Sequence, residues 1–142
     1  MFYNFKKNKK AFTLVELIVV IAIIAILGAV VGVTVSSFVD KARVSAAESP
    51  LKDLKGYWDG AIAEGQTLSQ FVATYFKDDT GNFSCSSDAW GTKVSKLGTV
   101  NIYYHENDGA TGDYYGKLEI KSGTPDAVTS SKTAPTNTVA YK

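Results

Sequence analysis

The sequence has very few residues of the types that most catalytic and metal sites use. Its single cysteine, Cys85, excludes an intrachain disulfide. It leaves a free thiol, an intermolecular bridge or a partly buried structural cysteine, and we favour the structural cysteine. The single histidine, His105, cannot supply a zinc ligand set. No Ser-His-Asp or Cys-His pairing and no glycine-rich phosphate loop is evident. The sequence therefore predicts a protein that is not an enzyme.

Beyond the first eleven residues acidic side chains outnumber basic ones, although the formal net charge of the chain is +1. Four lysines, at positions 6, 7, 9 and 10, lie in this leader with no acidic residue among them. The rest of the chain has eleven basic and fourteen acidic side chains, so its formal net charge is mildly negative. This balance argues against strong nucleic-acid binding by a single subunit.

What the sequence does contain is one long apolar run, Phe12 to Val35, whose only charge is Glu16. As a helix, this run spans roughly 36 Å at about 1.5 Å per residue, enough to cross the hydrocarbon core of a bilayer. The basic leader before it places the N-terminus in the cytoplasm and the rest of the chain outside. A carboxylate in such a segment costs roughly 2.5 kcal/mol or more, so it needs a partner.

The leader has two interpretations. It is either the basic part of a secretory signal or the part removed by a cut before the apolar run, which the run's length favours. The segment Ala11–Val20, AFTLVELIVV, resembles the class III signal of type IV pilins and pseudopilins. The resemblance implies that a prepilin peptidase cuts between Ala11 and Phe12 and that the Phe12 amine is then N-methylated. The family usually has glycine where this chain has Ala11, so we expect slower processing.

Two roles are open for Glu16. Thr13 and Glu16 fit the S/T-x-x-E capping box, which satisfies orphan amides at a helix start. The resemblance implies a second role, pairing with the Phe12 amine of a neighbouring subunit during assembly. We favour the second role, because an unpaired carboxylate in a membrane is costly.

The predicted fold is α+β, with a long N-terminal helical spine packed against a small antiparallel sheet, as in pilins. An apolar stripe at helical spacing extends the helix to about residues 60–65, with Pro50 as a kink. The predicted parts are a leader (1–11), a transmembrane and polymerisation helix (12–39), an amphipathic helix (40–64) and a globular head (65–142).

Within the head, a capping box at Thr67 and Gln70 predicts a second helix up to Phe76. Alternating patterns predict strands over 100–105 and 114–121, and a final strand at 139–141. We expect residues 82–98 to be irregular and 122–138 to form a surface loop. The stretch Asp88–Gly91 is similar to a D-P-W-G stretch of major pseudopilins, but we favour a turn that packs Trp90 on the sheet.

An acidic, glycine-rich connection joins the two central strands. Glu106, Asp108 and Asp113 carry oxygens suited to Ca²⁺, and major pseudopilins are known for a calcium-binding loop. The spacing matches no EF-hand, so a plain hairpin turn without a cofactor is favoured.

The resemblance implies a structural subunit that polymerises with copies of itself. A prepilin peptidase, an assembly ATPase and an inner-membrane platform protein would act on it, and the final location would be a surface pilus or a pseudopilus. Alternatives within the family are a major pseudopilin of a type II secretion-like system and a DNA-uptake pilin. A membrane-anchored binding module is the alternative from another class, but it leaves Glu16 unexplained.

Overall fold

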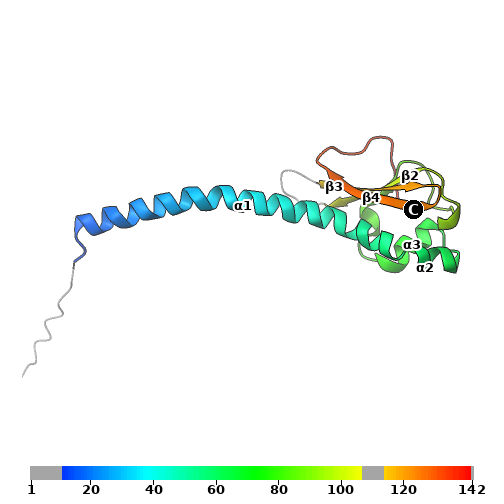
Figure 1. Cartoon of the computed structure of the whole chain (residues 1–142), viewed down its shortest axis with the longest axis horizontal. Coiled ribbons are helices and arrows are strands. Elements are labelled where there is room, and N and C mark those ends of the chain that lie inside the picture. Colours follow the sequence, from blue (N-terminus) through cyan, green and yellow to red (C-terminus); the bar gives the residue numbers. More distant parts are fainter. Residues whose placement is uncertain (1–10, 107–113, 142) are drawn as a thin grey trace, which may run out of the picture. The chain divides into compact units, whose positions relative to one another are not determined.

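The computed structural model describes residues 11–106 and 114–141, and the described chain is α+β. Helix α1 (Leu14–Gly56) comes first, followed by two short helices, α2 (Trp58–Glu64) and α3 (Leu68–Tyr75) (Figure 1). By its internal contacts the chain divides into two units, which meet between Val39 and Asp40 within α1. The second unit begins at Asp40 and contains the whole sheet. It is called the head below, and so includes part of α1 as well as the predicted globular part.

The head sheet has five antiparallel strands in the order β4-β3-β2-β1-β5. The strands are β1 (Phe83–Cys85), β2 (Val100–Glu106), β3 (Tyr114–Lys121), β4 (Thr124–Ser131) and β5 (Val139–Ala140). The alternating burial along β2 and β3 confirms the faces predicted from the sequence. One face of these strands therefore lies in the core and the other is partly exposed.

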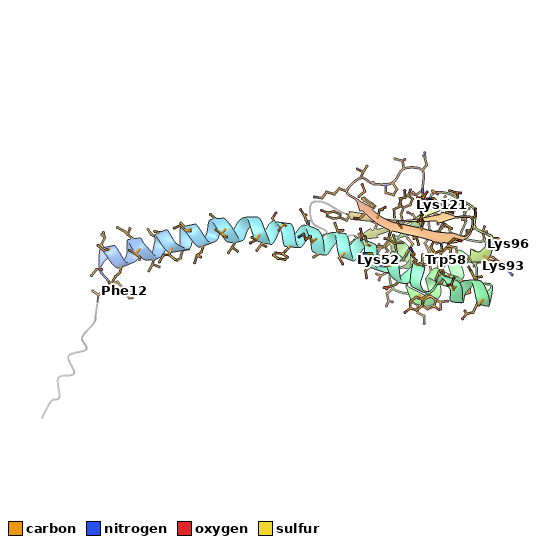
Figure 2. The ribbon with its side chains drawn as sticks, viewed as in Figure 1. Phe12, Lys52, Trp58, Lys93, Lys96 and Lys121 are labelled. Atoms are coloured by element: carbon orange, nitrogen blue, oxygen red, sulfur yellow. The ribbon has the colours of Figure 1, made fainter. Side chains whose placement is uncertain are left out.

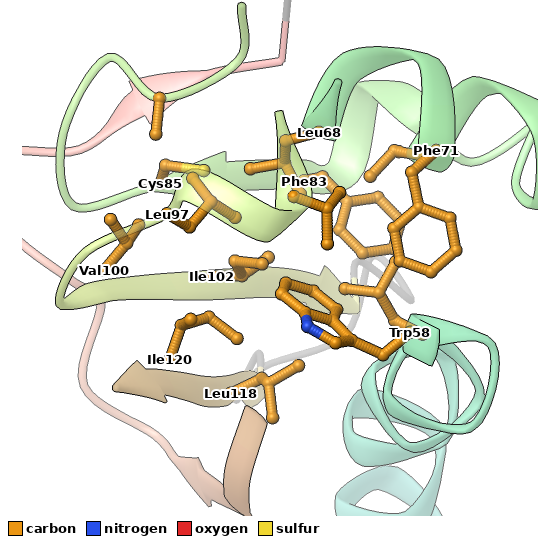
Figure 3. Packing of buried hydrophobic residues seen from close by; sticks show 14 of the residues in the cluster. Trp58, Leu68, Phe71, Phe83, Cys85, Leu97, Val100, Ile102, Leu118 and Ile120 are labelled. Carbon is orange, nitrogen blue, oxygen red and sulfur yellow. The ribbon is translucent and has the colours of Figure 1, made fainter. Parts of the chain in front are cut away.

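The core lies between the sheet and the helices. Within α1 and α2, the apolar stripe predicted from the sequence is buried at Ala47, Leu51, Leu54, Trp58 and Ala61. This stripe meets the buried face of β2 and β3, and Figure 3 shows Trp58 beside Phe71 and Leu118. The indole Nε1 of Trp58 donates a 2.8 Å hydrogen bond to the buried carbonyl of Gly123 in the β3–β4 turn. The two layers are thus joined by a polar contact as well as by apolar burial.

The helix predicted to run unbroken to residues 60–65 is interrupted at Tyr57. It continues through Pro50, ends at Gly56 and resumes as α2. Tyr57 has φ −92° and ψ 3°, and its ring stacks on Tyr75 of α3 at 4.5 Å. Gly56 is a poor helix former, so a tertiary contact can override the local helical preference here.

The predicted loop over 122–138 is wrong for about half of its length, because Thr124–Ser131 form the edge strand β4. Ser122 and Gly123 both have positive φ, 50° and 76°, as a two-residue type I′ hairpin turn requires. The predicted irregular stretch 82–98 likewise contains β1. The second helix and its capping box at Thr67 and Gln70 are confirmed.

Candidate functional site: the N-terminal segment of helix α1

The candidate site is the start of α1, where Thr13 and Glu16 form a capping box. The Thr13 backbone N–H and hydroxyl donate to Glu16 Oε2 at 2.8 and 2.9 Å. The Glu16 N–H donates to Thr13 Oγ1 at 3.3 Å. The capping role predicted for Glu16 is therefore present. Within the described residues no hydrogen bond reaches the other carboxylate oxygen, Oε1, so one oxygen remains available to another group.

Apolar surface surrounds this polar start. From Phe12 to Val35 the large apolar side chains that the structure describes are between 49% and 85% exposed. Figure 2 shows Phe12 at the beginning of α1, with side chains projecting all around the helix beyond it. By length and composition α1 is the one described helix that could cross a membrane. A surface this apolar needs lipid or other protein around it.

Two glycines interrupt this apolar surface. Gly28 and Gly32 are four residues apart, and apart from the neighbouring helix backbone no atom of the described chain lies within 4 Å of where a β-carbon would stand on either. This spacing permits a close approach of another helix in a membrane. Both residues are helical, so glycine's low helix propensity does not break α1 here.

The other residues singled out from the sequence lie elsewhere. The leader residues 1–10, and Asp108 and Asp113 of the suggested calcium loop, lie outside the described residues. Glu106 ends β2. Residues 11–106 and 114–141 contain no group of three or more His, Cys, Asp or Glu side chains that could hold a metal ion.

Cys85 is a fully buried free thiol in β1. Burial, with a smaller effect from the nearby charge of Asp88, raises the pKa of the Cys85 thiol to about 12. A thiol that stays protonated and shielded is a poor nucleophile, which agrees with the favoured interpretation as a structural cysteine, although its burial is complete rather than partial.

Trp90 is buried as well, and its Nε1 donates to the Val139 carbonyl at 3.2 Å. Its ring also meets Tyr141 edge to face at 5.2 Å. Trp90 therefore fixes the last strand to the head, as the interpretation of Asp88–Gly91 as a structural turn expects.

The comparisons with known proteins identify the same N-terminal segment. Residues 6–32 match the family described as the prokaryotic N-terminal methylation motif. The segment therefore carries the class III signal of type IV pilins and pseudopilins. No curated protein and no solved structure matches the chain. The match covers most of the apolar run Phe12–Val35 but no part of the head.

Proposed function

We propose that this protein is a structural subunit of a type IV pilus-like filament, assembled through its apolar N-terminal helix. The observation that carries the proposal is the methylation motif over residues 6–32. It is supported by a helix whose apolar side chains find no cover within the described chain. Proteins with this motif are structural pilin subunits, and we extend that non-enzymatic role to this chain.

Processing takes place at the bond between Ala11 and Phe12. A prepilin peptidase removes residues 1–11 on the cytoplasmic side, and the new Phe12 amine is N-methylated. Ala11 is small enough to stand in for the usual glycine. Before assembly the membrane holds the precursor through Phe12–Val35, with the head on the outer side.

Assembly uses the Glu16 carboxylate. The capping box occupies only Oε2, so Oε1 can accept a bond from the positive Phe12 amine of a neighbouring subunit. Two opposite charges that meet in an apolar surrounding neutralise each other, whereas either one alone is strongly unfavourable there. The pair would set the axial register of neighbouring helices. Capping and charge pairing are thus compatible functions of one side chain.

Substitution of Glu16 tests this role. Glu16→Gln keeps a capping side chain but leaves the partner's amine unpaired, so we expect at least about a tenfold loss of filaments. Thr13→Val is the matched control, because it removes the hydroxyl bond to Oε2 and keeps the charge. Filaments are sheared from cells and quantified against subunit remaining in the membrane. Normal filament yield from Glu16→Gln would reject the charge pair and leave capping alone.

The same machinery serves pili, secretion pseudopili and DNA-uptake pili, and we place this chain among the pili. An assembly ATPase and an inner-membrane platform protein would extract the subunit from the membrane. Sheared filaments from the cell surface would agree with a pilus. Filaments confined to the cell envelope, together with a secretion defect on deletion, would instead indicate a pseudopilin.

A further inference from the structure

Helices α2 and α3 form a short antiparallel pair whose two ends differ in chemistry. The residues Gly65–Thr67 join the helices at one end, and the stacked rings of Tyr57 and Tyr75 close the other. Lys93 pairs with Thr67 in an isolated β-bridge, and Val94 N–H donates to the Gln66 carbonyl at 2.9 Å. The loop that carries Lys93 is therefore fixed at the end opposite to the tyrosines.

The end that is closed by the two tyrosines, called the tyrosine end, combines aromatic rings with carboxylates. Tyr57 and Tyr75 are 51% and 40% exposed, and with Ile62 they are the large apolar or aromatic side chains most exposed in the described part of the head. Exposed carboxylates adjoin both rings in sequence. They are Asp53, one helical turn before Tyr57, and Asp78 and Asp79, just after α3. Lys52 and Lys55 flank Asp53, but Lys52 pairs with Glu48 and Lys55 donates to the Asp126 carbonyl. Lys77 is then the cation left beside the three carboxylates, so the tyrosine end is net acidic.

The end at which Gly65–Thr67 join the two helices, called the lysine end, is basic. Lys93 and Lys96 are exposed and lie three residues apart, because Lys93 precedes the short turn Val94–Lys96 and Lys96 ends it (Figure 2). In the described part of the chain neither forms an ion pair. Glu64 is the acidic residue at this end, and the Gln66 side chain donates a hydrogen bond to it. The lysine end thus presents two cations for an external partner.

We propose that the tyrosine end of one copy binds the lysine end of the next copy, which makes this contact an interface between the heads of neighbouring subunits in the filament. Ammonium groups suit both features of the tyrosine end, because they pair with carboxylates and lie favourably over aromatic faces. The two surfaces differ and lie at opposite ends of one helix pair. Their contact is therefore heterologous, and such contacts build an open helical array when the rotation between copies does not close a ring. This inference rests on the proposed filament function.

Chemical crosslinking of filaments from the full chain tests the contact. Thr74→Cys places a thiol beside Tyr75, and Ser95→Cys places one between the two lysines. Both positions are exposed, and the natural thiol, Cys85, is buried. A short bifunctional maleimide should link the doubly substituted subunits into a ladder of multimers and leave each single variant monomeric. Dimers from either single variant would show a symmetric contact and overturn the proposal, as would filaments without any ladder.

Charge exchange gives an independent readout. Lys93→Asp with Lys96→Asp should lower the filament yield roughly fivefold or more, because the loss recurs at every contact. Asp78→Lys with Asp79→Lys should do the same, and all four changes together should restore the yield. Lys117→Asp, on the other face of the sheet, is the control for charge alone. Failure of rescue with normal wild-type filaments overturns this contact, whereas absence of wild-type filaments contradicts the proposed function itself.

Discussion

The carbonyl oxygen of Ala47 in α1 occupies the space where a β-carbon on residue 116 of β3 would lie. Gly116 is the third residue of β3, and Ala47 is completely buried. The Cδ1 atom of Leu51 would also lie 2.9 Å from that β-carbon. Helix and strand can come this close only because residue 116 has no side chain. The glycine therefore sets the distance between the two layers of the head.

Gly116→Ala should destabilise the head by about 3 kcal/mol, because the added methyl meets helix backbone that cannot rotate away. Thermal unfolding of the full chain in detergent, followed by tryptophan fluorescence, measures the effect, since both tryptophans are buried in the head. Gly60→Ala is the matched control. Nothing lies within 4 Å of its β-carbon position, and alanine favours the helix. Equal stability of the two variants would contradict the close approach.

Trp58→Phe should lower the free energy of unfolding by about 1–3 kcal/mol. The substitution leaves the buried carbonyl of Gly123 without its donor and reduces the volume beside Phe71. Chemical denaturation in detergent measures the change, with fluorescence from the remaining Trp90. A loss below about 0.5 kcal/mol would show that the indole hydrogen bond does not hold the β3–β4 turn to the helices.

Cys85 should resist alkylation in the folded protein and react once the head unfolds. Its pKa is raised from 9.0 to about 12, so at neutral pH the thiol is protonated as well as buried. The folded state binds this proton more tightly than the unfolded state does. The resulting stability is therefore complete below pH 9 and is lost as the pH rises toward 12.

The Cys85→Ala variant isolates this pH effect, since it lacks the titrating thiol. Between pH 9 and 12 its stability should fall less steeply than that of the wild type. Rapid labelling of native wild-type protein by iodoacetamide, or identical alkaline slopes for the two proteins, would contradict the buried thiol.

Periodicity in the sequence is enough to predict the elements that bury one regular face. The stripe from Ala47 to Ala61 and the alternation along β2 and β3 each place large apolar residues in the core. The Thr67 capping box is equally local, because the residues that form it lie three apart. For such elements the local pattern and the tertiary packing agree.

Strand β4 could not be predicted in this way, because it lies at the sheet edge and buries no regular face. Tertiary contacts hold it instead. Lys55 of α1 donates to the Asp126 carbonyl at 2.8 Å, and Lys121 pairs with the Asp126 carboxylate at 2.7 Å. The positive φ of Ser122 and Gly123 fits a Ser-Gly turn signal, which was the one local indication of a hairpin.

The candidate site and the tyrosine end of the head differ in the same way. The capping box at Thr13 and Glu16 follows from four consecutive residues, so the sequence is sufficient to predict it. The break at Tyr57 depends on Tyr75, eighteen positions further along the chain, and no local pattern encodes that stack. The tyrosine end of the head is therefore visible only in the folded chain.

The most direct test of the central proposal is mass spectrometry of subunits from purified native filaments. The account predicts a chain that begins at Phe12, lacks residues 1–11 and carries one methyl group on its N-terminal amine. The leader's four lysines would be absent from every filament peptide. Filaments whose subunits retain residues 1–11, or begin beyond the apolar helix, would contradict it.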